Sequence, residues 1–116
     1  NGRAEELAHR VGWREAFPMA TARAVADLRV LLELVLPFVE VGGYFFAMKG
    51  PLASAQEEIE NAEKALKVLG GEVEKVCEID DNKASLGLRS VVVIKKTQRT
   101  PKEYPRSVGM PNKRPL

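Results

Sequence analysis

Histidine and cysteine are almost absent from this 116-residue chain, which has one residue of each. His9 and Cys77 alone cannot form a zinc site, and one cysteine cannot form an internal disulfide, so we expect no metal ion and a reducing compartment such as the cytoplasm. A Ser-His-Asp or Cys-His arrangement would have to use His9, four residues after Glu5 on a predicted helix, where a plain exposed side chain is the simpler interpretation. The sequence therefore leaves the catalytic residues unknown.

Long apolar runs and a leader segment are missing as well. The longest apolar stretch, residues 30–48, is interrupted by two glutamates, Pro37 and the pair Gly42-Gly43. It falls well short of the roughly 20 apolar residues that a membrane span needs. No basic segment followed by an apolar run and a small-residue cleavage site opens the chain. We therefore expect neither membrane contact nor secretion.

The glycine-rich phosphate-binding motifs G-x-G-x-x-G and G-x-x-x-x-G-K-[ST] do not occur in the chain. In proteins that have them, the glycines allow backbone N–H groups to approach a phosphate closely. Any nucleotide site in which this chain takes part must then be completed by residues that the chain does not contain.

Charge is present but uneven. Residues 1–94 hold 11 basic and 15 acidic side chains, whereas residues 95–116 hold 7 basic and 1 acidic side chain. Each phosphate neutralised by Lys or Arg releases counterions, so this pattern favours contact between the tail and a polyanion. A disordered, solubilising end explains the same charge. We divide the chain into a body, residues 1–96, and a basic, proline-rich tail, residues 97–116.

Apolar spacing predicts helices that alternate with strands. We expect a helix that is entered through residues 3–8 and includes His9, further helices at residues 25–38 and 54–69, and strands at residues 17–21, 44–48, 72–79 and 88–96. Ser54 and Glu57 form a capping box at the start of the third helix, which ends at Gly70. Residues 80–87 are short enough to join the last two strands as an antiparallel hairpin.

This order predicts an α/β fold with a mostly parallel sheet, one antiparallel strand near an edge, and residues 44–48 as a central strand. Ligands of such sheets bind outside the carboxyl ends of the parallel strands. The turn at residues 2–6, the strand end at Arg23 and the strand end at Lys49 are expected to meet there. Each of the two basic residues could equally be an ordinary surface side chain.

Four stretches resemble the family of ribosomal RNA small subunit methyltransferase G, also called glucose-inhibited division protein B. They are GRAEE at 2–6, TARAVA at 21–26, LPFVEVGGYFFAMKG at 36–50 and TPKEYPRSVGMPNKRP at 100–115. The last stretch is the most specific, since the general methyltransferase fold does not require it. The resemblance implies the carboxyl-terminal half of a Rossmann-like class I methyltransferase sheet.

The resemblance also implies a function: methyl transfer from S-adenosyl-L-methionine to N7 of a guanosine in 16S ribosomal RNA of the small ribosomal subunit. It implies that Ala4 and Glu5 lie beside the adenosine part of the cofactor and that Arg23 closes the site. The family's glycine-rich motif lies upstream of GRAEE, so the N-terminal half of the same protein would be missing. With an RNA substrate, the expected RNA contacts are Lys49 and the tail residues Lys102, Arg106, Lys113 and Arg114.

The expected chemistry is compatible with a single histidine. Guanine N7 has an in-plane lone pair and no proton, so its attack on a sulfonium methyl group needs alignment and desolvation more than a general base. Two alternatives stay open: a non-catalytic RNA-binding or assembly module, and an enzyme acting on another nucleotide-bearing substrate. Without its other half, the sheet would have an open edge and an uncovered apolar face, and the chain is expected to self-associate.

Overall fold

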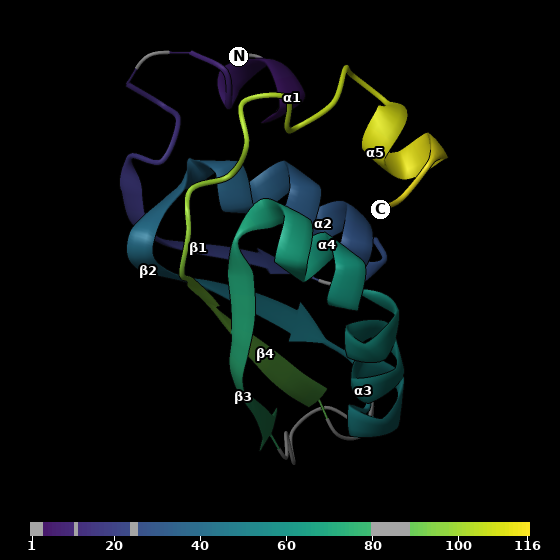
Figure 1. Ribbon diagram of the computed structural model, residues 1–116. Coiled ribbons are helices and arrows are strands. Elements are labelled where there is room, and N and C mark those ends of the chain that lie inside the picture. Colours follow the sequence, from purple (N-terminus) through teal and green to yellow (C-terminus); the bar gives the residue numbers. More distant parts are fainter. Residues whose placement is uncertain (1–3, 11, 24–25, 80–88) are drawn as a thin grey trace.

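The computed structural model describes residues 4–10, 12–23, 26–79 and 89–116. Figure 1 shows strands and helices that alternate along the chain and a tail that crosses back over the helices. The elements are α1 (Ala4–Leu7), β1 (Phe17–Arg23), α2 (Leu28–Val35), the 3₁₀ helix η1 (Leu36–Phe38), β2 (Val39–Lys49), α3 (Leu52–Asn61), α4 (Glu63–Leu69), β3 (Gly71–Ile79), β4 (Arg89–Lys96) and α5 (Met110–Lys113).

The four strands form one mixed sheet in the order β1-β2-β4-β3. β1 pairs with β2 in parallel, while β4 is antiparallel to both β2 and β3. The predicted central strand is therefore an interior one. The expectation of a mostly parallel sheet holds only in part, because the second strand of the β3–β4 hairpin inserts between β2 and β3. Both pairings of β4 are then antiparallel, and the predicted connection at residues 80–87 lies outside the described residues.

Helix α2 begins directly after its N-cap residue, Asp27. The Asp27 side chain accepts a hydrogen bond from the Arg29 N–H at 3.0 Å, which satisfies one of the free donors at the helix start. The α-helix ends before Pro37, and a 3₁₀ turn completes the predicted helical stretch. The apolar positions of α2 and the first residue of η1 form one fully or nearly buried stripe, which comprises Leu28, Leu31, Leu32 and Leu36.

The expected capping box at Ser54 is wrong. α3 begins at Leu52, Pro51 is its N-cap, and no side-chain capping hydrogen bond forms there. Pro51 lacks an N–H and has a fixed φ near −60°, so it starts the helix before Ser54 is reached. The predicted single helix is also two, because the backbone at Ala62 leaves helical geometry with φ −96° and ψ 3°. The apolar stripe nevertheless continues, since Ala62, Leu66 and Leu69 are all buried.

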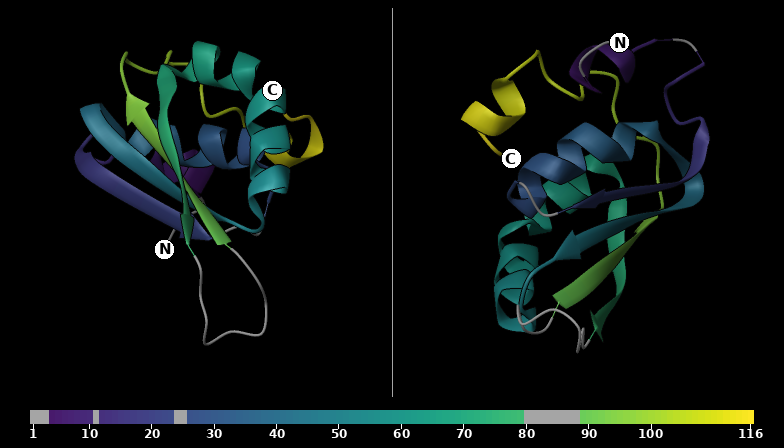
Figure 2. Two further views of the ribbon diagram at one scale, coloured as in Figure 1. Left: turned by 90° about the horizontal axis from the view of Figure 1, so that it is seen from below. Right: turned by 180° about the vertical axis from the view of Figure 1, so that it is seen from behind.

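The described helices lie on one side of the sheet, as the left panel of Figure 2 shows. Successive strand residues point to opposite faces. Phe45 and Ala47 of β2 face the helices and are fully buried in the core. Met19 on β1 and Met48 on β2 point to the other face and are 59% and 45% exposed. No described helix covers this second face, which we call the open face.

The tail is folded rather than extended into solvent. It passes along the side of the molecule that carries α1 and α2, and it ends at α5 (Figure 1). Pro105 and Pro111 of the tail are buried. A bilayer-crossing helix does not occur within the ranges that the structure describes.

Candidate functional site

A pocket of about 360 Å³ lies at the carboxyl ends of β1 and β2. This volume falls in the range of small-molecule sites. The pocket lies at the edge of the sheet where sequence reasoning expected a ligand. Its lining combines two arginines with apolar side chains and comprises Arg23, Met48, Lys49, Gly50, Ile79, Arg89, Ser90 and Val91.

Strand register explains why the two arginines share this pocket. Arg23 pairs with Met48, and Met48 pairs with Val91, so these three side chains form a row across the open face. Arg89 lies two residues before Val91 on β4 and thus points to the same face, opposite Ile79 on β3. The pocket therefore combines apolar side chains with two arginines that belong to the same face of the sheet.

Sequence reasoning missed Arg89. The residue follows a polar segment and belongs to no motif, so nothing local marks it. Strand alternation could have found it, because Arg89 is two positions before Val91 in a predicted antiparallel strand. Such a strand starts at the edge of the sheet where its parallel neighbours end, and its first outward-facing residue lies beside their carboxyl ends.

Lys49 reaches the predicted edge with its backbone, but its ammonium group points to the helices. The side chain is 4% exposed, and Nζ lies 2.8 Å from Oε1 of Glu58 and donates to the Ala26 carbonyl at 2.6 Å. The same Glu58 oxygen accepts the Leu28 N–H at 2.9 Å. Lys49 thus joins the end of β2 to the start of α2 and to Glu58 in the second half of α3.

Helix α1 does not line the pocket beside Arg23. It packs on the outer side of α2, next to the tail (Figure 1), and the Glu5 carboxylate accepts the Gly109 N–H at 3.1 Å. Glu5 is 7% exposed. Of the three segments expected to meet, the structure brings together those of Arg23 and Lys49. Residues 2 and 3 and the side chain of Ala4 lie outside the described residues.

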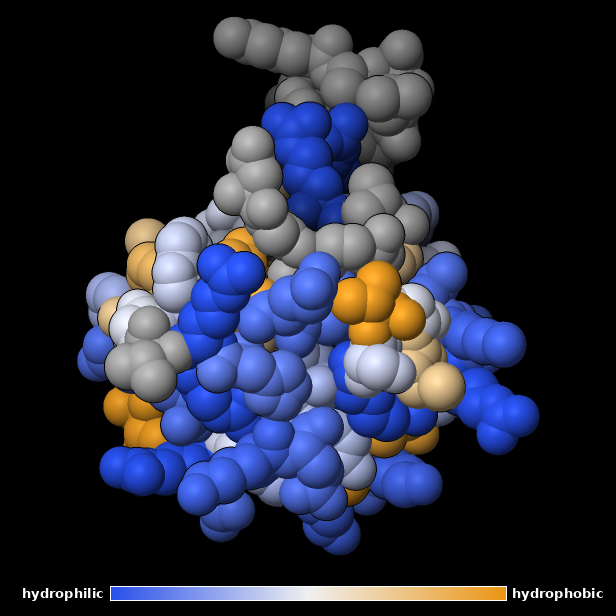
Figure 3. Space-filling view, turned by 90° about the horizontal axis from the view of Figure 1, so that it is seen from above, coloured by the Kyte–Doolittle hydropathy of each residue, from blue (hydrophilic) through white to orange (hydrophobic). Residues whose placement is uncertain are grey.

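The four basic tail residues named from the sequence fall into two groups. Lys102, Lys113 and Arg114 are exposed. Arg106 instead binds the Glu33 carboxylate on α2, with Nη2 2.8 Å from Oε1, and its Nη2 also donates to the Arg114 carbonyl. The hydrogen bond to Glu33 raises the pKa of Arg106, although burial opposes the shift. Hydrophilic side chains dominate this side of the molecule, as Figure 3 shows.

Comparison with solved structures first shows a known protein that shares this fold. The M. jannaschii TYW2 protein, solved in complex with AdoMet, has the same fold with a TM-score of 0.51 and 16% identity, over 79% of this chain and 43% of that one. The family follows from sequence. A family model described as rRNA small subunit methyltransferase G matches residues 1–87, and the chain belongs to this family, which confirms the resemblance.

Curated members of the family match along the whole chain. Over 116 residues the chain is 46% identical to the ribosomal RNA small subunit methyltransferase G of Clostridium novyi and 48% identical to that of Acetivibrio thermocellus. In both cases the match covers 100% of this chain and 46% of the relative. The chain thus spans about half the length of the curated relatives it matches.

Proposed function

We propose that the complete protein transfers a methyl group from S-adenosyl-L-methionine to N7 of a guanosine in 16S ribosomal RNA, in the cytoplasm. The observation that carries this proposal is the family match, which extends over residues 1–87 and names small-subunit ribosomal RNA as the substrate of the family. The pocket lined by Arg23 and Arg89 supports it, because apolar side chains together with cationic ones suit a planar base with nearby negative charge.

The described residues fit one part of a cofactor site. Arg23 lies at the carboxyl end of β1 and lines a pocket large enough for a nucleoside-sized group. We propose that Arg23 closes the site on S-adenosyl-L-methionine. We also propose that Ala4 and Glu5 of α1 lie beside the adenosine, as the GRAEE motif implies, at a part of the site away from the Arg23 pocket, which α1 does not line. When bound, this cofactor supplies an electrophilic methyl group on sulfur. The glycine-rich part of the site would come from the rest of the longer protein, of which this chain is about half.

We propose that the exposed tail residues Lys102, Lys113 and Arg114 contact RNA phosphates. Arg106 and Lys49 would support RNA binding indirectly, because their charged groups are already held by Glu33 and Glu58. Arg106 holds the tail, and Lys49 holds the strand end beside Arg23. We add Arg89 as a contact to the substrate nucleotide, because it lines the same pocket as Arg23.

The test is methyl transfer by the complete enzyme to small ribosomal subunits, with the product identified by mass spectrometry of the digested RNA. We expect N7-methylguanosine with wild type and a strong loss of product with Arg23→Ala. Lys64→Ala, an exposed residue on α4, is the matched control. RNA binding without cofactor binding would favour the non-catalytic RNA-binding module instead. Methylation of a different nucleotide substrate would favour the other alternative.

A further inference from the structure

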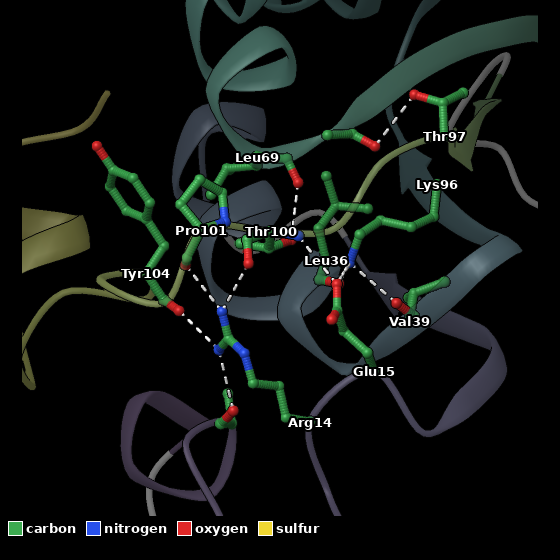
Figure 4. A network of polar contacts seen from close by, with 12 residues as sticks. Arg14, Glu15, Leu36, Val39, Leu69, Lys96, Thr97, Thr100, Pro101 and Tyr104 are labelled. Carbon is green, nitrogen blue, oxygen red and sulfur yellow. Dashed lines mark hydrogen bonds and ion pairs between the residues drawn. The ribbon is translucent and has the colours of Figure 1, made fainter.

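One arginine that belongs to no recognised motif holds two distant parts of the chain together. The Arg14 guanidinium donates hydrogen bonds to four backbone carbonyl groups (Figure 4). Nη1 bonds Ala8 at 3.1 Å and Tyr104 at 2.7 Å, while Nη2 bonds Thr100 at 3.0 Å and Pro101 at 2.8 Å. Arg14 therefore joins the end of the α1 segment to the first turns of the tail.

Only arginine can make this set of contacts. Its planar guanidinium presents five N–H donors in a fixed fork, whereas lysine offers three donors from a single nitrogen. Carbonyl oxygens that lose their donor in a partly buried site remain desolvated without compensation. The position of the tail relative to α1 is thus sensitive to this one side chain.

The residue next to Arg14 fixes the same junction. Glu15 has a left-handed backbone, with φ 49°, a conformation that a residue with a side chain keeps only where its surroundings impose it. Its carboxylate accepts the Thr100 N–H at 2.9 Å and lies 3.0 Å from Nζ of Lys96. Lys96 is fully buried and also donates to the carbonyl groups of Leu36 and Val39, as Figure 4 shows.

Farther along, the tail contacts α1 and the turn that follows it. His9 Nε2 lies 2.8 Å from the Pro105 carbonyl oxygen, and Glu5 accepts the Gly109 N–H at 3.1 Å. Between these two contacts, Arg106 binds Glu33 on α2. The segment of α1 is therefore held between α2 and the tail.

Because α1 is so short, these contacts determine its position. A helix of four residues is too short to be stable alone, because nucleation costs more than so few hydrogen bonds return. Its place is set by what packs against it, and here that is α2 and the tail.

We propose that Arg14 is a positioning residue for the cofactor-binding segment. By binding the tail to the end of α1, it fixes Ala4 and Glu5, so cofactor affinity depends on how the tail is docked. This inference rests on the proposed function, in which α1 lies beside S-adenosyl-L-methionine. Because the same tail carries the exposed basic residues proposed to bind RNA, RNA binding and cofactor binding are coupled, and the coupling is reciprocal.

The first experiment measures S-adenosyl-L-methionine affinity of the complete enzyme by calorimetry. Arg14→Gln is expected to raise Kd by about fivefold or more, the lower limit of ordinary coupling between sites, and Arg14→Lys by a smaller factor. Arg99→Gln, which removes an exposed arginine from the same segment, is the control and leaves Kd unchanged.

The second readout separates positioning from general stability. Cofactor Kd is measured with and without bound 16S ribosomal RNA, and the ratio is the coupling factor. Wild type has a ratio different from one, and Arg14→Gln moves it toward one. A variant that merely lowers stability leaves this coupling factor unchanged in the molecules that remain folded.

A third measurement needs no variant and applies even if Arg14→Gln fails to fold. Hydrogen exchange of the wild-type enzyme should show that the cofactor protects amides at residues 100–109 as well as at residues 4–10. If these tail amides do not respond and Arg14→Gln keeps wild-type cofactor affinity while Arg23→Ala loses it, the positioning role is overturned and the proposed function stands. If wild type binds no S-adenosyl-L-methionine at all, the proposed function itself fails.

Discussion

The carboxylate of Glu33, which has no exposed surface, accepts hydrogen bonds from both the backbone N–H and the guanidinium of Arg106, 73 residues farther along the chain. The distances are 2.7 Å from N to Oε2 and 2.8 Å from Nη2 to Oε1. An unpaired buried carboxylate would cost several kcal/mol. Part of the tail's positive charge therefore neutralises a buried acid of the body. Docking of the tail supplies both the charge partner and the hydrogen-bond donors of Glu33 on α2.

Breaking this pair should destabilise the protein. Arg106→Ala leaves Glu33 buried without its charge partner, and we expect the free energy of unfolding of the complete protein to fall by about 3 kcal/mol. Replacing both residues with Met should recover much of the loss. Urea denaturation measures both effects, with Arg99→Ala as a control expected to stay within about 0.5 kcal/mol of wild type. An Arg106→Ala protein as stable as wild type would show that the pair is dispensable.

Acid should weaken the junction between Glu15 and the tail. Burial alone would raise the pKa of the Glu15 carboxyl, but the hydrogen bonds from the Thr100 N–H and the Lys96 ammonium outweigh it and lower that pKa from its usual 4.5. An acid with a lowered folded-state pKa contributes stability above its unfolded pKa and loses it as pH falls through the folded pKa. We expect stability to fall below pH 4.5, and less steeply in Glu15→Gln, as followed by urea denaturation at stepped pH. Parallel pH profiles for the two proteins would contradict this role.

The exposed tail charges should control the salt dependence of RNA binding. Changing Lys102, Lys113 and Arg114 to Gln in the complete enzyme should weaken binding to 16S ribosomal RNA and flatten its logarithmic salt dependence, by roughly 0.7–0.9 in slope for each phosphate that is no longer neutralised. Cofactor affinity without RNA should hardly change, because these side chains do not hold the tail in place. Lys67→Gln on α4 is the matched control, and filter binding at several salt concentrations is the measurement. An unchanged slope would remove the tail from the RNA interface.

The open face should make the 116-residue chain self-associate. Met19 and Met48 expose apolar surface on this face, and β1 is an edge strand of the described sheet. We expect light scattering to show species larger than a monomer, and Met19→Lys with Met48→Lys to reduce them without unfolding the core. Val108→Lys changes an exposed apolar residue of the tail and serves as the control. A monomeric wild-type chain with residues 17–22 as protected from hydrogen exchange as residues 44–48 would contradict the prediction.

Several elements could be predicted because their signals are local. The apolar run at residues 44–48 predicted an interior strand, and β2 is one. The short connection after Ile79 predicted an antiparallel hairpin, and β3 pairs with β4 in that way. The helix start at Ser54 was wrong because two local signals compete there, and Pro51 acts earlier in the chain than the serine.

What the sequence by itself determined is the alternation of helices and strands, the edge at which Arg23 and Lys49 lie, and the family. These depend on periodicity and on motifs of adjacent residues. Only the tertiary structure decided that β4 inserts beside β2, that Arg89 and Arg23 line one pocket, and that Arg106 binds Glu33 while Arg14 binds the tail backbone. A charged side chain pairs with whichever distant groups tertiary packing buries beside it. Residue spacing along the chain does not contain that information.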